Sequence, residues 1–262
     1  MISEITRYLI DTPILTYHQI TAETQPQDRW RLSVSAFQFE RQMDYLHEHG
    51  YHALSLMELF PTPGKARRQK EKSVILTFDD GYENFYTHAY PIIRRHGFTA
   101  TVFLITGQIG KRSDQEGETG VPYLNWDQVR SLHEDGITFG SHTRTHRRLC
   151  PLSDGEIRSE FVISKASLED GLGVGIHLLA YPYGDSNFEI QKMATEAGYE
   201  AACGMAKGRS HRFNLWRTQC RSNDALLGFV ARLSKWSRYT RWIKEETTIG
   251  RYLRMAKRKF RQ

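Results

Sequence analysis

The chain has 262 residues, of which 39% are hydrophobic and 12% aromatic, a composition that excludes a disordered chain and a length that fits one large domain or two small ones. It contains no apolar run of about 20 residues, so we expect no membrane-spanning helix. The formal net charge is +6, which invites a nucleic-acid interpretation. However, residues 217–262 hold 13 Lys and Arg against three Asp and Glu, and the preceding part is net −4. The main body is therefore mildly acidic, which argues against a basic groove across it.

Apolar runs alternate with helical patterns along the first 216 residues, and a glycine follows most of the helical stretches. Strands are predicted at residues 14–17, 74–78, 99–104, 137–140 and 177–181, with weaker ones at 51–54, 199–203 and 215–220. Helices are predicted at 35–50, 84–96, 125–134, 156–170 and 186–197, with Ser35 as an N-cap and Ser153 with Glu156 as a capping box. This alternation predicts a mostly parallel α/β fold over residues 1–222.

The C-terminal residues 223–262 form a separate region of the sequence. Two amphipathic stripes, at 226–243 and 249–260, alternate with Lys and Arg and predict a basic helical extension, its first helix capped by Ser222 or Asn223. We expect the apolar stripes to pack on the main body or to lie on an anionic membrane surface. Stacking of its aromatic residues on nucleic-acid bases is the less favoured interpretation.

Polar motifs stand at the ends of several predicted strands, where parallel α/β folds place their active sites. The first is T-Y-H, ending at His18. The second is T-F-D-D-G, whose adjacent carboxylates, Asp79 and Asp80, repel each other unless a cation or a proton is shared. Taken alone, the T-F-D-D-G motif also fits an ordinary helix cap and turn.

The third motif is S-H-T-R-T-H, in which His142 and His146 are four residues apart. A helical turn would place both imidazoles on one face, where they could bind one metal ion, although an isolated pair with this spacing is also common on protein surfaces. Combined with the aspartates, the two histidines would leave coordination sites open for water and substrate. The fourth motif, A-Y-P-Y-G, would expose a backbone N–H near Tyr183 to an oxyanion, or it is a plain turn.

In this order, the motifs resemble those of the polysaccharide deacetylases of carbohydrate esterase family 4, over roughly residues 14–223. The T-Y-H motif is similar to that of the subgroup that deacetylates poly-N-acetylglucosamine. The resemblance implies a distorted (β/α)7-type barrel and a divalent metal ion, foremost Zn²⁺, with Ni²⁺, Co²⁺ and Fe²⁺ as alternatives. It also implies hydrolysis of N-acetyl groups on a sugar or polysaccharide.

The resemblance assigns roles to individual residues. Asp79 matches the catalytic base, and Asp80, His142 and His146 match the metal ligands. The backbone of Tyr183 would help to hold the oxyanion, and His18 is the candidate general acid, with a structural histidine as the other interpretation. Tyr82, Trp126 and Pro182 are candidates to line the sugar site, although Trp126 also fits a packing role.

One position departs from the family pattern. Many members have an arginine two residues before the proline of the P-Y-G motif, where this chain has Ala180. Arg217 is the candidate replacement that would support the base; a surface arginine is the other interpretation. The missing arginine also motivates an alternative function, that of a carbohydrate-binding pseudoenzyme.

The expected partner is an N-acetylated glycan, with peripheral membrane contact through 223–262 and no nucleic acid. The first twenty residues show no secretory signal, and three widely spaced cysteines fit a reducing compartment. We therefore expect a cytoplasmic enzyme at the inner face of the membrane, acting on a precursor in cell-surface or exopolysaccharide biosynthesis.

Overall fold

The computed structural model describes residues 12–23, 28, 30–60, 72–113, 120–205 and 210–234. Its centre is a parallel sheet in the order β10-β1-β5-β6-β7-β8-β9, with β4 paired to β5. The strands are β1 (Ile14–Tyr17), β4 (His52–Ala53), β5 (Ser73–Phe78), β6 (Thr101–Leu104), β7 (Thr138–Ser141), β8 (Leu178–Ala180), β9 (Ala201–Cys203) and β10 (Thr218–Gln219). Each of them overlaps a predicted strand, so the parallel α/β prediction is confirmed.

The segment before β10 brings the two edges of this sheet together. Leu215 N–H donates to the Ala202 carbonyl, and Gly204 N–H donates to the Leu215 carbonyl. A few residues later, Thr218 pairs in parallel register with Leu15 of β1. Residues 215–219 therefore contact β9 on one side and β1 on the other, and the sheet curls into the predicted distorted barrel.

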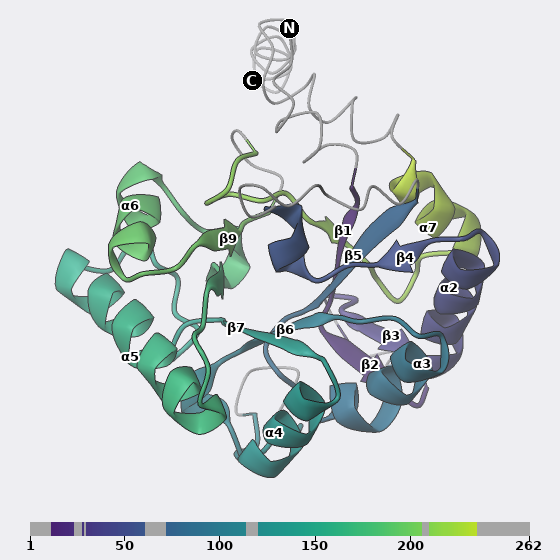
Figure 1. The fold of residues 1–262 in the computed structure, drawn as a ribbon, viewed down its shortest axis with the longest axis horizontal. Coiled ribbons are helices and arrows are strands. Elements are labelled where there is room, and N and C mark those ends of the chain that lie inside the picture. Colours follow the sequence, from purple (N-terminus) through teal and green to yellow (C-terminus); the bar gives the residue numbers. More distant parts are fainter. Residues whose placement is uncertain are drawn as a thin grey trace, which may run out of the picture.

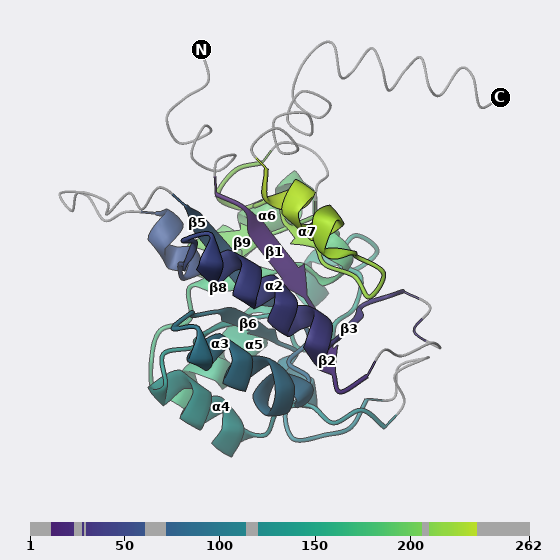
Figure 2. The same cartoon turned by 90° about the vertical axis from the view of Figure 1, so that its right-hand side faces the viewer.

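Helices surround the curled sheet (Figure 1). They are α2 (Ala36–Glu48), α3 (Tyr90–Arg95), α4 (Trp126–Glu134), α5 (Asp154–Leu172), α6 (Phe188–Glu196) and α7 (Leu226–Leu233). Figure 2 shows α2 along the outer face of the molecule, with α7 next to it. The predicted N-cap at Ser35 and the capping box of Ser153 and Glu156 are both present. No described helix is both long and apolar enough to cross a bilayer.

Both faces of the central strands are buried, which explains why most residues of β1, β5, β6, β8 and β9 are apolar. Alternate residues face the helices, as Leu15 and Leu76 do, and the others face the inside of the curl. The inner core contains Ile75, Phe103 and Leu215. Its polar continuation toward the carboxyl ends of the strands holds the residues of the candidate site.

The structure differs from the prediction in a few elements. A small parallel pair, β2 (Gln19–Thr21) and β3 (Ser33–Ser35), was not expected. The predicted helix at 84–96 is a π-helical turn, Phe85–Ala89, that continues into α3. The N-cap position of helix α7 is Ala225, which makes no side-chain cap, rather than Ser222 or Asn223. The rest of the predicted extension, including its second helix, lies outside the described residues.

Candidate functional site

The two aspartates that follow β5 point to different partners. Asp79 continues the strand and faces the inside of the curl, whereas Asp80 adopts a left-handed conformation with a φ of 72°. Gly81 is also left-handed, and a Cβ there would lie 2.4 Å from Leu104 Cδ2, so this tight turn needs glycine. Because the turn separates the carboxylates, each has its own charged or polar neighbours.

Asp79 forms a buried ion pair with Arg217. The Arg217 Nη1 and Nη2 atoms lie 2.6 and 2.7 Å from the two carboxylate oxygens of Asp79, a bidentate arrangement that is stronger than a single contact. Arg217 also donates to Thr77 Oγ1 and to the Gly204 carbonyl, at 3.3 Å each. Burial would raise the pKa of Asp79, but Arg217 outweighs it, with smaller help from His142 and His18, and holds that pKa well below its usual range.

Asp80, His142 and His146 come together beside this ion pair. Asp80 Oδ1 lies 3.4 Å from His142 Nε2 and 3.3 Å from His146 Nε2. His142 Nδ1 is 2.7 Å from the Ala180 carbonyl. A carbonyl only accepts, so Nδ1 carries the proton and the lone pair of Nε2 faces Asp80. Burial lowers the pKa of His142 to about 3, which keeps the imidazole neutral.

These three side chains fit a divalent metal ion. Their potential ligand atoms lie within 4.8 Å of one another, and in the described part of the chain no other His, Cys, Asp and Glu side chains form such a group. Two neutral imidazoles and one carboxylate are donors that Zn²⁺ and similar cations accept, and three protein ligands leave coordination positions open. The hydrogen bond from His142 to a backbone carbonyl is typical of metal-binding histidines.

The histidine pair is not on a helix, which corrects the expected helical turn. Residues 142–148 form an irregular loop between β7 and α5. In this loop Thr143 and His146 adopt left-handed conformations, with φ of 66° and 60°, and the two imidazole centroids lie 4.8 Å apart. The four-residue spacing therefore brings the rings together through a folded loop instead of a helical face.

The P-Y-G turn after β8 lies against this loop. It forms a 3₁₀ turn, Pro182–Gly184, in which Tyr183 is left-handed with a φ of 59°. The Tyr183 ring is half exposed, with its centroid 4.8 Å from that of His146, and the Arg148 guanidinium stacks over it at 4.2 Å. The backbone N–H that we predicted to donate to an oxyanion is thus in a turn next to the cluster, and the preceding Pro182 is buried.

His18 lies between β1 and β2, on the same side of the sheet as Asp79. It is half-buried, and it is close enough to lower the pKa of Asp79. Its Nδ1 is buried and has no hydrogen-bond partner among the described residues. His18 is thus on the side of the curl that holds the base, and its role as the general acid stays a hypothesis.

Left-handed backbone is concentrated at this site. Five described residues other than glycine have a positive φ. Four of them are Asp80, Thr143, His146 and Tyr183, and the fifth is Arg31. Strained backbone of this kind persists where the surrounding structure enforces it, which is common at functional sites.

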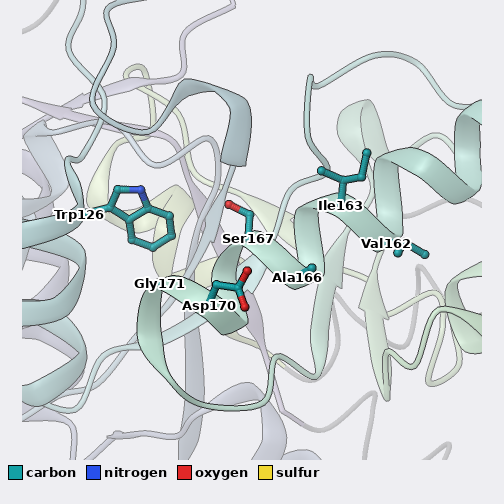
Figure 3. A pocket seen from close by; sticks show the side chains of 7 residues that line it. All are labelled: Trp126, Val162, Ile163, Ala166, Ser167, Asp170 and Gly171. Carbon is teal, nitrogen blue, oxygen red and sulfur yellow. The ribbon is translucent and has the colours of Figure 1, made fainter.

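Two predicted sugar-site residues are packed against other residues of the chain. The Tyr82 ring is 1% exposed and stacks on Tyr123 at 4.9 Å, so its face is unavailable to a ligand. Trp126, at the start of α4, lies against Gly171 of α5, where a Cβ would be 2.1 Å from the indole. Figure 3 shows Trp126 in a surface pocket with Asp170 and other α5 residues. The packing interpretation of Trp126 therefore agrees with its position.

Two α5 residues that contact the histidine loop, Glu160 and Ser164, were not predicted from the sequence. Glu160 accepts hydrogen bonds from the loop backbone, and Ser164 bonds Ser141 at 2.6 Å. Their signal was present, because they interrupt the buried face of α5 that otherwise consists of Ile157, Phe161 and Leu168. Polar residues at core positions of a helix indicate a specific partner.

Known proteins are similar to this chain in sequence and in fold. The family model described as polysaccharide deacetylase matches residues 66–202. YxkH of Bacillus subtilis (strain 168) is 31% identical over 200 residues, which cover 76% of this chain and 66% of that protein. A Staphylococcus aureus (strain MSSA476) protein named poly-beta-1,6-N-acetyl-D-glucosamine N-deacetylase is 29% identical over 175 residues, covering 63% of this chain and 59% of that protein.

A solved structure also matches most of the chain. The Streptococcus pyogenes deacetylase PplD, determined in complex with acetate, aligns with a TM-score of 0.75 and 26% identity. The alignment covers 85% of this chain and 98% of that one. The chain is thus similar to that deacetylase along nearly its whole length, whereas it spans only 59–66% of the two curated relatives.

Proposed function

Because the chain belongs to the polysaccharide deacetylase family, we propose that it is a metal-dependent hydrolase that removes N-acetyl groups from an N-acetylated saccharide. The observation that carries the proposal is the pairing of Asp79 with Arg217 directly beside the Asp80–His142–His146 cluster. A charged base and a set of open metal ligands at the carboxyl ends of parallel strands are the parts that amide hydrolysis needs.

Asp79 is the proposed general base. Arg217 keeps its carboxylate ionised and fixes both oxygens through the bidentate contact. An ionised, oriented carboxylate can take a proton from the attacking water while that water approaches the acetamide carbon. Since Arg217 is itself held by Thr77 and Gly204, the base has little freedom to turn away.

Asp80, His142 and His146 are the proposed metal ligands. A divalent cation bound there would supply the Lewis acidity that lowers the pKa of a water molecule and polarises the acetamide carbonyl. The hydrogen bond from His142 to the Ala180 carbonyl fixes the ring and keeps its Nε2 available.

His18 is the proposed proton donor, and the Tyr183 N–H is the proposed hydrogen-bond donor to the oxyanion. His18 lies near Asp79 and would protonate the departing amine through its half-buried ring. The Tyr183 N–H, in the turn beside His146, would donate to the oxyanion that develops on the carbonyl. Arg148 covers the exposed Tyr183 ring and supports this turn.

The name of one relative supports the proposed substrate class. One is named for acting on poly-beta-1,6-N-acetyl-D-glucosamine, so oligomers of that sugar are the first substrates to test. We propose a role in cell-surface or exopolysaccharide synthesis, with Zn²⁺ as the first metal to assay. A cytoplasmic location at the inner face of the membrane stays a prediction that cell fractionation would test.

The alternative is a binding protein without turnover, which the residue at Ala180 suggested. Ala180 is fully buried in the inner core, and the guanidinium of Arg217 reaches the base from the other side of the curl. The charge that a family arginine would bring to Asp79 is therefore present. This observation favours the enzyme over the binding protein.

The test is acetate release from N-acetylglucosamine oligomers. We expect release with added Zn²⁺ or Co²⁺, loss after chelation, and a decrease of about 10²–10⁴-fold in kcat for Asp79→Asn, because the base no longer accepts a proton. Asp127→Asn is the matched control: this exposed carboxylate pairs with Arg130 at the surface and its loss should leave kcat unchanged. Oligomer binding without acetate release, with any of these metals, would support the binding protein instead.

A further inference from the structure

The loop that carries His142 and His146 has no regular structure of its own to hold it. Two of its residues, Thr143 and His146, are in left-handed conformations that residues other than glycine rarely adopt. A loop of this kind keeps one shape only if its backbone groups are bound to a fixed neighbour. That neighbour is helix α5.

Glu160 of α5 binds the middle of the loop. Its Oε2 accepts from the backbone N–H groups of Arg144 and Thr145, at 2.8 and 2.9 Å. Its Oε1 accepts from the Thr145 hydroxyl at 2.6 Å. Consecutive N–H groups that converge on one carboxylate oxygen form a concave anion site in the backbone, here located between the two histidines.

The carboxylate of Glu160 depends on the loop as much as the loop depends on it. The residue is 7% exposed, and no described Lys or Arg forms a salt bridge with it. A buried charge needs strong hydrogen bonds, and these three donors provide them. One turn further along α5, Ser164 bonds Ser141 Oγ, which accepts from Thr143 N–H at 3.0 Å.

We propose that Glu160 is a positioning residue of the metal site, which fixes the loop so that His146 faces Asp80 and His142. The inference rests on the metal site of the proposed function. Helix α5 does not need Glu160 to stay on the sheet, because the buried side chains of Ile157, Phe161 and Leu168 pack there. The effect of Glu160 should therefore appear in metal binding more than in folding.

The test is metal affinity of the metal-free full chain. Co²⁺ and Zn²⁺ would be titrated against a competing chromogenic chelator, with the Co²⁺ absorption spectrum as a record of ligand geometry. For Glu160→Ala we expect an affinity about 10–100-fold lower, as for other residues that orient metal ligands, and an altered spectrum. Glu160→Gln should bind the metal almost as tightly as the unmodified chain. Its amide oxygen can accept both N–H groups, and its amide nitrogen can donate to the Thr145 hydroxyl.

Glu169→Ala is the matched control on the same helix. Glu169 Oε1 accepts from Lys165 Nζ at 2.6 Å and from Ile176 N–H at 3.0 Å, and it lies nine residues, or about 13 Å, further along α5. Its loss should lower stability and leave metal affinity unchanged. If Glu160→Ala fails to fold, Thr145→Val removes only the hydroxyl donor, and we expect this folded variant to bind Co²⁺ more weakly.

Different outcomes bear on the positioning role of Glu160 and on the proposed metal site. If Glu160→Ala folds and binds the metal as tightly as the unmodified chain, the positioning role alone is overturned. If Glu160→Ala does not fold, the same metal affinity in folded Thr145→Val would overturn it. A chain whose Co²⁺ affinity does not change with His146→Ala would overturn the proposed metal site as well. Weak binding in Glu160→Ala, with recovery in Glu160→Gln and no change in Glu169→Ala, would establish the role.

Discussion

The contact between Asp79 and Arg217 shows how this chain keeps a charged base inside a protein core. Both side chains are at most 5% exposed, and an isolated charge at such a place would be strongly disfavoured. The bidentate contact, with Thr77 and the Gly204 carbonyl as further partners, compensates for the lost hydration. The base and its arginine therefore form one unit, and changing either should affect both activity and stability.

Arg217→Gln should expose this dependence. Removing one partner of a buried ion pair costs about 3–5 kcal/mol, which urea unfolding would measure. Because burial raises the pKa of Asp79 once the guanidinium no longer opposes it, the acid limb of the kcat/KM profile should move to higher pH. Arg217→Lys keeps the positive charge but not the bidentate contact. We therefore expect a smaller loss of stability and a smaller shift of the acid limb.

Two comparisons control for a general effect of losing an arginine. Arg158→Gln removes a half-exposed partner of Glu196 at the surface and should change stability by less than about 1 kcal/mol. In an Asp79→Asn background, Arg217→Gln should lower the free energy of unfolding much less than in the unmodified chain, because the ion pair is already broken. An equal loss of unfolding free energy in both backgrounds would mean that the ion pair does not couple Asp79 to Arg217.

At the scale of single residues, sequence patterns predict which side chains take part in chemistry better than they predict which aromatic side chains are open to a ligand. Each motif alone has an ordinary interpretation, but the aspartates and histidines were predictable in combination, because adjacent carboxylates and paired imidazoles at neighbouring strand ends together indicate a shared cation. Arg217 was a candidate only because Ala180 left a charge missing. The positions of Tyr82 and Trp126 could not be predicted, because an aromatic ring at the edge of a site and one packed on a neighbouring helix have the same local sequence. The stacking on Tyr123 and the contact with Gly171 are tertiary.

At the scale of elements, helix α5 links the fold to the site. Its N-terminus begins with the capping box of Ser153 and Glu156, and its middle carries the residues that hold the histidine loop. Glu156 also pairs with Arg147, near the end of that loop, at 3.0 Å. The start of α5 therefore fixes one end of the loop, and the Glu160 carboxylate fixes its middle.

The capping box should make part of the stability depend on pH. Hydrogen bonds from the Ser153 backbone and hydroxyl, followed by Arg147, lower the pKa of Glu156 from 4.5 to about 2. A carboxylate whose pKa is lower in the folded chain contributes stability above its unfolded pKa, and the contribution is lost as the pH falls through the folded value. The thermal midpoint of the unmodified chain should therefore exceed that of Glu156→Gln at pH 6, and the gap should close between pH 4.5 and 2.

Glutamine is the suitable replacement because it can still complete a capping box. The measurement therefore isolates the charge from the hydrogen-bond geometry. Ser153→Ala, which removes the other half of the box, should lower the midpoint at both pH values. A gap between the unmodified chain and Glu156→Gln that stays constant with pH would show that the carboxylate charge does not contribute.

The predictability of the elements follows from what stabilises them. Most residues of the main strands are apolar, so their composition largely identifies them, and α2, α4, α5 and α6 carry their own side-chain N-caps. Strands β2 and β3 are short and polar and exist because they pair with each other, which no local pattern records. The histidine loop was mistaken for a helical turn because its shape depends on Glu160 and Ser164, which follow it in the chain.

At the scale of the whole molecule, the charge divides the chain into two parts. Most of the curled sheet and of its helices belongs to residues 1–216, which are net −4, whereas the basic excess belongs to residues 217–262, which include β10 and α7. Within that segment, Arg217 is neutralised by Asp79, and Arg232 pairs with Asp224. Most of the remaining positive charge lies beyond Ser234, on stripes that alternate with apolar residues.

This distribution predicts binding to anionic membranes. Basic residues near an anionic surface contribute about 1 kcal/mol each, and the attraction weakens as salt shortens the Debye length. We therefore expect the full chain to sediment with vesicles that contain phosphatidylglycerol, less so at 0.5 M NaCl, and not with pure phosphatidylcholine. A chain ending at Ser234 keeps α7 and the candidate site, so it should lose vesicle binding and keep acetate release. Replacing the basic residues of 251–261 by glutamine should have the same effect, whereas salt-sensitive binding to DNA without binding to vesicles would assign the charge to a nucleic-acid partner.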